Sequence, residues 1–145
     1  MALTEGFNHV AILTTDLERL AAFYDSVFEV TASPVQKMEH PPCLRHAFLA
    51  VGNGTVIHAI EDPEAAPMFP GEIGKRGPVD HLAIGVRDRA TLELVRDRLV
   101  ALRASRGLVK DFGAIRSVFF RDPDGMECEV AYWIASDASP TGEGP

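Results

Sequence analysis

An internal repeat is the feature that most constrains the fold of this chain. The segment NHVAILTTDLERLAAFYDSV, which begins at Asn8, aligns with DHLAIGVRDRATLELVRDRL, which begins at Asp80. The alignment places His9 on His81, and both segments contain a short apolar strand, a capped turn and an amphipathic helix. A chain that repeats one supersecondary unit is expected to fold as two copies of that unit.

The repeat continues beyond the two helices. The turns G-N-G and D-P-D-G align so that Gly54 falls on Gly125, and His58 then falls on Glu129. Both turns have the residues that hairpins require. Each half of the chain therefore predicts an α+β unit of strand, helix and three strands, a β-α-β-β-β module, and the two modules are expected to be related by a pseudo-twofold axis.

These patterns predict one domain over residues 1–135 and its internal boundaries. Module one is expected over about 5–61 and module two over about 78–135, joined by a Pro- and Gly-rich linker over 62–77. Residues 136–145 have no apolar run to bury, so we expect a disordered tail there.

The expected elements follow from periodicity and capping. Thr15 and Glu18 form a T-x-x-E capping box before the first helix, and Asp88 is the expected cap of the second. The expected helical core stripes are Leu17, Leu20, Tyr24 and Phe28, and Leu92, Val95, Leu99 and Leu102. The expected strands lie near Phe7–Leu13, Val30–Val35, Leu44–Val51, Thr55–Ile60, Val79–Val86, Val109–Phe112, Ser117–Arg121 and Glu127–Ile134.

Composition excludes several classes of protein. The net charge of −7 and the lack of any Lys/Arg run argue against nucleic-acid binding, which needs clustered cations. No apolar stretch is long enough to span a membrane, and the N-terminus does not resemble a secretory signal. Cys43 and Cys128 are isolated in sequence, so we expect free thiols and a cytoplasmic protein. No phosphate-binding glycine motif or nucleophile motif is present.

Strand alternation places polar side chains at repeat-related positions. His9 corresponds to His81, and His58 corresponds to Glu129. If the two modules close around a shared cleft, all four side chains could converge there. Imidazole and carboxylate ligands suit a divalent ion such as Fe, Mn, Co, Ni or Zn, whereas a structural hydrogen-bonded histidine is the alternative interpretation of each residue alone.

The residues quoted above resemble the vicinal oxygen chelate superfamily, which includes glyoxalase I, extradiol dioxygenases and bleomycin-resistance binding proteins. The resemblance runs from about Phe7 to Trp133 and is carried by FNHVAILTTDLERLAAFYDSVF, VDHLAIGV and SVFFRDPDGMECEV. It implies an incomplete mixed β-barrel around a central cleft and a homodimer.

The resemblance also implies a metal site with His9, His81 and Glu129 as ligands. A fourth ligand in the glyoxalase branch is usually Glu, but this chain has His58 at that position. A second departure is F-E-V at Phe28 to Val30, where many relatives carry L-G-[FY].

The expected function is that of a divalent-metal-dependent glyoxalase-like enzyme, of lyase or isomerase type, acting on a small hydrophobic substrate with neighbouring oxygens. Candidate bases are Glu127, His58 and a displaced Glu129. Lyase chemistry is favoured because a fourth ligand would close a site that dioxygen needs open. The alternatives are an Fe(II) extradiol-type dioxygenase and a metal-free, bleomycin-resistance-like binding protein.

Substrate contacts are expected from aromatic and cationic side chains. The aromatic candidates are Phe48, Phe119 and Trp133. The cationic candidates, which would suit a phosphonate substrate, are Arg45, His46, Lys110, Arg116 and Arg121.

Overall fold

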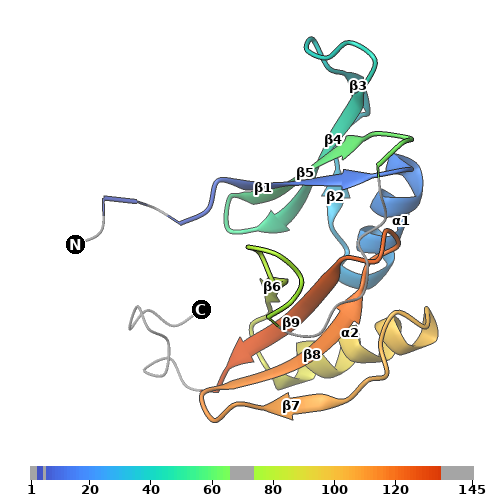
Figure 1. Ribbon diagram of the computed structural model, residues 1–145. Helices are drawn as coiled ribbons and strands as arrows, with labels where there is room; N and C mark the ends of the chain where they lie inside the picture. The colour runs from blue at the N-terminus through green and yellow to red at the C-terminus, as the bar shows by residue number, and fades with distance from the viewer. Residues whose placement is uncertain (1–2, 5, 66–73, 135–145) are drawn as a thin grey trace. The chain divides into compact units, whose positions relative to one another are not determined.

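The computed structural model describes residues 3–4, 6–65 and 74–134 (Figure 1). The chain divides into two compact units, Met1–Pro67 and Met68–Pro145, and each is described by itself. The expected tail at 136–145 and part of the expected linker lie outside the described residues.

Unit 1 is a sheet with one helix. Its sheet has the order β1-β5-β4-β2, with β3 also paired to β4. The first strand runs parallel to β5, and the other pairs are antiparallel. The elements are β1 (His9–Thr14), α1 (Leu17–Phe28), β2 (Thr31–Ala32), β3 (Gln36–Lys37), β4 (Arg45–Gly52) and β5 (Thr55–Glu61).

Unit 2 repeats this plan. Its sheet has the order β6-β9-β8-β7, and again the first strand is parallel to the last while the others are antiparallel. The elements are β6 (Leu82–Gly85), α2 (Arg89–Ala101), β7 (Val109–Asp111), β8 (Ile115–Arg121) and β9 (Glu127–Trp133). The predicted α+β class with two β-α-β-β-β modules is confirmed, and over the described residues neither sheet closes into a barrel.

The first helix begins one residue later than predicted. Asp16, not Thr15, is the N-cap of α1, and its carboxylate accepts a hydrogen bond from the Arg19 N–H at 2.8 Å. The predicted capping box of Thr15 and Glu18 is wrong, because the Glu18 carboxylate pairs with Arg45 of β4. At the other end Glu29 takes a left-handed conformation with φ 57°, the role that glycine usually fills.

The predicted core stripes are mostly buried. In α1 the buried residues are Leu17, Leu20, Tyr24 and Val27. Asp88 caps α2 as predicted, and Leu92, Val95 and Leu99 are buried, but Leu102 is 49% exposed because the helix ends before it. In unit 1 α1 packs on β4 and β5, and in unit 2 α2 packs on β8 and β9. The sheet residues Leu49, Ile57, Val118 and Phe120 are buried as well.

The second predicted strand is broken in two. Residues 33–35 separate β2 from β3, because Pro34 cannot donate to a strand ladder. The predicted hairpin turns are present: Asn53 and Gly54 both have positive φ, and the Asp122 carboxylate accepts two backbone N–H groups in the D-P-D-G turn. Cys43 and Cys128 are both free. Among the described residues, no helix is both long and apolar enough to cross a membrane.

Candidate functional site

In unit 1, a histidine cluster forms where β1 lies beside β5. Register pairs Ala11 with His58, which brings the rings of His9 and His58 to a centroid distance of 5.9 Å. The His9 Nδ1 atom lies 2.9 Å from the Asn8 side-chain oxygen. That hydrogen bond leaves His9 Nε2 as the nitrogen available for a ligand.

His58 is also held by its neighbours on β4. His46 Nδ1 lies 2.8 Å from His58 Nε2, and Phe48 stacks on the His58 ring at 4.6 Å. Burial, followed by the charges of His46 and His9, lowers the pKa of His58. His58 is therefore a neutral imidazole at pH 7, a form that can accept a proton.

In unit 2, His81, the residue before β6, faces Glu129 of β9. His81 Nε2 lies 3.2 Å from Glu129 Oε2, while His81 Nδ1 lies 2.8 Å from Asp80 Oδ1. If Nδ1–H donates to Asp80, the lone pair of Nε2 points at the Glu129 carboxylate. Two acceptors so close need a proton or a cation between them, so this pair fits a divalent ion in its donor types and its spacing.

The Asp80 carboxylate is itself fixed by the segment that precedes it. It accepts the Gly74 N–H at 2.7 Å and pairs with Arg76 at 2.9 Å. Hydrogen bonds from Gly74 and His81, and the charge of Arg76, lower the pKa of Asp80. Arg76 is only 9% exposed and also reaches Glu127, at 3.7 Å. The carboxylate that holds His81 is therefore ionised and positioned.

The two arrangements are equivalent under the repeat. Ala11 pairs with His58 just as Ala83 pairs with Glu129, so the expected correspondence of strand positions is present in the register. Asn8 and Asp80, each one residue before a candidate histidine and in contact with it, are candidate site residues that the sequence did not single out. The signal was visible in the repeat as the dipeptides N-H and D-H.

The candidate base Glu127 is engaged by arginines. Its carboxylate pairs with Arg121 at 3.0 Å and with Arg76. Phe119 lies close to the ligand candidates: it pairs with Glu129 in register, and its ring contacts His81 edge to face at 5.2 Å.

Two other predicted substrate residues are placed differently. Trp133 ends β9 on the same face as Glu129, four residues further along the strand. Arg116 lies on the opposite face of the sheet from Glu129, since it alternates with Phe119, and it pairs with Asp111. The structure therefore does not bring Arg116 to Glu129. The Ser117 hydroxyl, on the Glu129 face, is buried and has no hydrogen-bond partner among the described residues.

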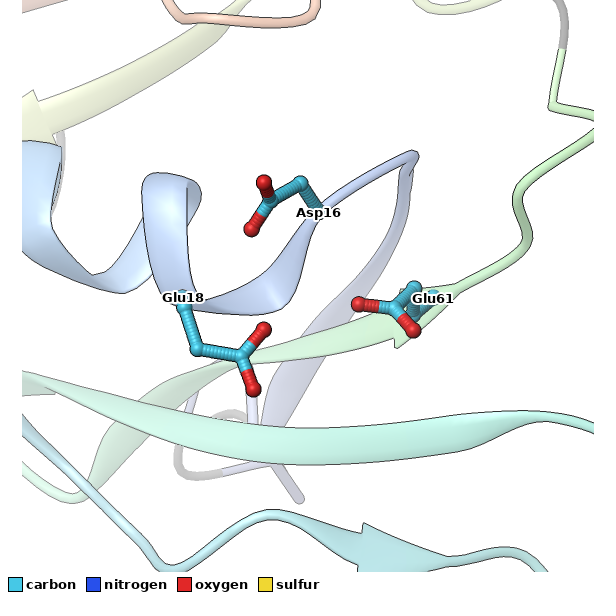
Figure 2. A group of neighbouring side chains, drawn as sticks. All are labelled: Asp16, Glu18 and Glu61. Atoms are coloured by element: carbon cyan, nitrogen blue, oxygen red, sulfur yellow. The ribbon is translucent and has the colours of Figure 1, made fainter.

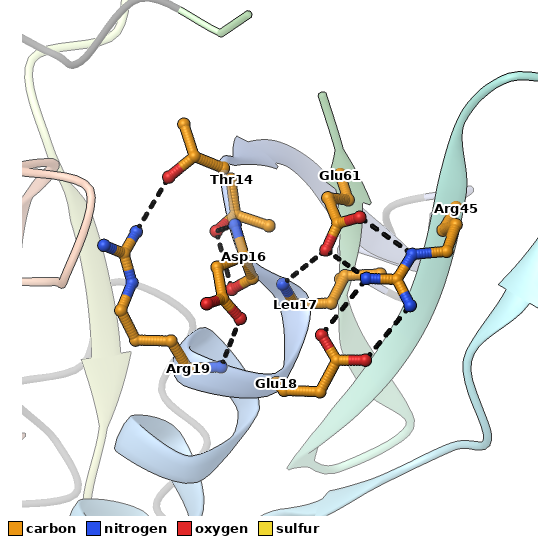
Figure 3. Close-up of polar contacts among 8 residues, drawn as sticks. Thr14, Asp16, Leu17, Glu18, Arg19, Arg45 and Glu61 are labelled. Carbon is orange, nitrogen blue, oxygen red and sulfur yellow. Dashed lines mark hydrogen bonds and ion pairs between the residues drawn. The ribbon is translucent and has the colours of Figure 1, made fainter. Parts of the chain in front are cut away.

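A separate acidic group lies at the start of α1. Asp16, Glu18 and Glu61 have carboxylate oxygens within 4.8 Å of one another (Figure 2). Figure 3 shows what they hold: Glu61 accepts the Leu17 N–H at 3.0 Å and pairs with Arg45 at 2.6 Å.

Arg45 balances this acidic group. Its guanidinium lies between Glu61 and Glu18, and hydrogen bonds to both raise its pKa. Asp16 meanwhile caps α1. Because the three carboxylates are bound by Arg45 and by backbone N–H groups of α1, they connect α1 to β4 and β5. Arg45 is occupied by Glu61 and Glu18 and is therefore not free to contact a substrate.

Comparison with known families gives one match. The family model described as Glyoxalase/Bleomycin resistance protein/Dioxygenase superfamily matches residues 6–130. No curated protein matches the chain.

Solved structures share the fold at low sequence identity. A glyoxylase/bleomycin resistance protein/dioxygenase domain from Frankia sp. EAN1pec has a TM-score of 0.76 at 20% identity, covering 90% of this chain and 98% of its own. A lactoylglutathione lyase from Agrobacterium tumefaciens has a TM-score of 0.62 at 20% identity, covering 90% and 96%. A mutant of the fosfomycin resistance protein FosX from Listeria monocytogenes, complexed with Mn(II) and 1S,2S-dihydroxypropylphosphonic acid, has a TM-score of 0.63 at 18% identity, covering 88% and 92%.

Proposed function

Because the chain belongs to the Glyoxalase/Bleomycin resistance protein/Dioxygenase superfamily, we propose that it is a divalent-metal-dependent enzyme of the lyase or isomerase type. Its substrate is a small molecule with two neighbouring oxygens. The observation that carries the proposal is the 3.2 Å approach of His81 Nε2 to Glu129 Oε2, with Asp80 holding the other ring nitrogen.

The ligands in this proposal are His9, His81 and Glu129. His81 and Glu129 have donor atoms close enough to bind one ion, since metal–ligand bonds of ~2.0–2.2 Å put neighbouring donors about 3 Å apart. His9 is held at Nδ1 in the same way as His81, so each histidine presents Nε2. The Mn(II) in the FosX structure and the family match support this assignment.

His58 is the base in this proposal. Its lowered pKa keeps it neutral, and its Nε2 is already engaged by His46, which leaves Nδ1 to accept a proton from substrate. His46 accepts the Nε2–H hydrogen bond and orients the ring, so that Nδ1 is the nitrogen left to take a proton. Glu127 is less suited to the role because Arg121 and Arg76 hold its carboxylate.

When bound, a divalent ion in such a site polarises two neighbouring substrate oxygens and stabilises negative charge on them. The residues of this chain then position the substrate and move the proton. Phe119 contacts the His81 ring, and Phe48, which is 38% exposed, stacks on the His58 ring. The lactoylglutathione lyase among the structural relatives supports lyase chemistry.

The test is metal content of the protein purified without a histidine tag. We expect about one equivalent per chain, lost in His9→Ala, His81→Ala and Glu129→Ala. His40→Ala, which removes an exposed histidine from the β3–β4 loop, is the matched control and should retain the metal. Absence of metal in every form, with none taken up from added Fe, Mn, Ni, Co or Zn, would end the enzyme proposal and favour the metal-free binding protein.

The His58→Ala variant tests the role of His58 in the proposed site. Retained metal agrees with a base role and three protein ligands, whereas lost metal makes His58 a fourth ligand. The Fe(II) dioxygenase alternative rests on the two histidines and one carboxylate, a donor set suited to non-haem iron. It predicts dioxygen consumption by the iron-loaded protein in the presence of a catechol, and a lyase does not.

The homodimer, like the cytoplasmic location, remains a prediction. Sedimentation equilibrium of the purified chain tests it directly, and a monomer at micromolar concentration would contradict it.

A further inference from the structure

A pocket in unit 2 gathers cationic side chains beside the ligand pair of His81 and Glu129. Its volume is about 620 Å³, within the range of small-molecule sites. The turn between α2 and β7 and the ends of β8 and β9 form its wall. Its charged and aromatic lining includes Arg103, Arg106, Lys110, Phe119, Arg121 and Glu127.

The turn that carries the arginines is fixed to the sheet. Ser105 donates its hydroxyl to the Phe119 carbonyl at 2.6 Å, and the Arg121 N–H donates to the Ala104 carbonyl at 2.9 Å. Gly107 has φ +70°, and an added Cβ there would lie 2.7 Å from Val100. Arg103 and Arg106 are therefore presented from a held backbone and not from a free loop.

The cations of this pocket are largely unbalanced. Arg121 pairs with Glu127, the pocket's own carboxylate. Over residues 74–134, no ion pair is formed by Arg103, Arg106 or Lys110. Three cations without an ion pair in the described part of unit 2, gathered around one hollow, are unexpected in a chain of net charge −7, and they attract an anion.

Phe119 connects this pocket to the ligand pair. The Lys110 ammonium lies 4.5 Å from the centre of the Phe119 ring, and the same ring contacts His81 at 5.2 Å. Lys110 pairs in register with Ser117, on the face of the sheet that carries Glu129. A single small molecule could therefore have one end at the cations and the other at His81 and Glu129.

We propose that this pocket binds an anionic group of the substrate, a phosphate, phosphonate or carboxylate, and so sets the substrate class of the enzyme. The inference rests on the proposed function only in assigning the anion to the substrate. It differs from the hydrophobic substrate expected from the sequence, and it develops the phosphonate alternative for which Lys110 and Arg121 were candidate contacts. The cations hold the anionic end, and Phe119 spaces it from the reacting oxygens.

The experiment is a titration of metal-free protein with inorganic phosphate and with malonate at low ionic strength, followed by amide NMR shifts. We expect shifts at the α2–β7 turn, and binding about fivefold weaker in Arg106→Ala and in Lys110→Ala, the size of one partly exposed charge contact. Lys110→Arg should restore binding. The relative affinity of phosphate and malonate then distinguishes a phosphoryl or phosphonyl group from a carboxylate.

The matched control is Arg87→Ala, which removes the same charge from an exposed position before α2. It should bind phosphate within about twofold of the parent protein, since a distant exposed charge is screened. Equal loss in Arg87→Ala and Lys110→Ala, or unchanged binding in Lys110→Ala, would overturn the inference. Melting curves of each variant exclude unfolding as the cause of any loss.

Metal content measured on the same preparations separates this inference from the proposed function. Lys110→Ala should retain the metal that His81→Ala loses. If no metal binds but phosphate binding still depends on Lys110, the enzyme proposal fails and the anion pocket stands. If metal binds but phosphate affinity is unchanged in Lys110→Ala and Arg106→Ala, the anion pocket is wrong and the proposed function stands.

Discussion

The two units place equivalent histidines in different electrostatic surroundings. In unit 1, His9 is held by the neutral amide of Asn8, and His58 by the imidazole of His46. In unit 2, His81 is held by the ionised carboxylate of Asp80, and its partner is Glu129. The repeat has thus preserved strand positions while the charge of each contact has changed.

If the proposed metal binds, this difference predicts which unit contributes more to its affinity. A carboxylate that accepts Nδ1–H makes the opposite nitrogen a stronger ligand and fixes its direction, whereas an amide oxygen polarises the ring less. Arg76 adds a further constraint in unit 2 because it spans Asp80 and Glu127. We therefore expect unit 2 to provide the dominant share of the metal affinity and unit 1 to provide the base.

The largest expected effect comes from exchanging the residues before the two histidines. Asp80→Ala should weaken metal binding by about 10- to 100-fold, the usual effect of removing a contact to a ligating histidine. Asn8→Ala should weaken it less, because a neutral amide contributes less to ligand strength. Competition titration with a chelating dye measures both dissociation constants.

Conservative variants sharpen this test. Asp80→Asn retains a hydrogen-bond acceptor without the charge, so its metal affinity should lie between those of the parent and Asp80→Ala. Asn8→Asp should strengthen binding. The comparison between the units would be wrong if Asn8→Ala and Asp80→Ala lost the same affinity.

A smaller effect is expected at Arg76. Arg76→Ala leaves Asp80 with its Gly74 and His81 contacts but removes the guanidinium that spans two carboxylates. Metal affinity should fall by about tenfold, at the lower end of the effects seen for outer contacts of metal ligands. Arg76→Lys, with one compact charge, should recover part of the loss in the same dye titration.

If Arg76 acted only on folding, the outcome would differ. The variant would then show a lower unfolding midpoint in urea but an unchanged metal dissociation constant in the folded protein. That result would show that Arg76 stabilises the fold and does not affect metal affinity.

The smallest effects are expected at the helix caps, which are the same residue type in both units. Asp16→Ala should lower the free energy of unfolding by about 1 kcal/mol, because the Arg19 N–H loses its acceptor. Asp88→Ala should also lower stability, through loss of the acceptor for the Thr91 N–H. Urea unfolding followed by circular dichroism measures both.

The Asp88 effect should depend on pH. Hydrogen bonds from the Thr91 N–H and then its hydroxyl lower the pKa of Asp88 below its ordinary value of 3.8. The folded protein therefore binds fewer protons than the unfolded chain, so this stabilisation is present above pH 3.8 and is lost as the pH falls through the lowered pKa. Asp88→Asn, which keeps an acceptor without titrating, should lack this pH dependence. A parent and Asp88→Asn with parallel pH profiles would contradict it.

Local sequence patterns predicted elements better than they predicted contacts. Asp88 was identified as a cap because its segment offers one suitable residue, but Thr15 was chosen over Asp16 because both fit a capping pattern. In the structure Arg45, which is distant in sequence, binds Glu18, and Asp16 is the cap of α1. Leu102 fitted the helical period, yet the helix ends before it.

The sequence by itself determined the two-module fold and the repeat-related positions of His9, His81, His58 and Glu129. Hydrophobic periodicity and turn residues depend only on neighbours along the chain, so the strands, helices and turns can be predicted without a structure.

Only the tertiary structure decided what surrounds those positions. The pairing of His46 with His58, the clamp of Arg76 on Asp80 and Glu127, and the cationic pocket beside Phe119 all join residues from different elements. Such contacts depend on strand register and on which rotamers reach across it, and no local pattern encodes those.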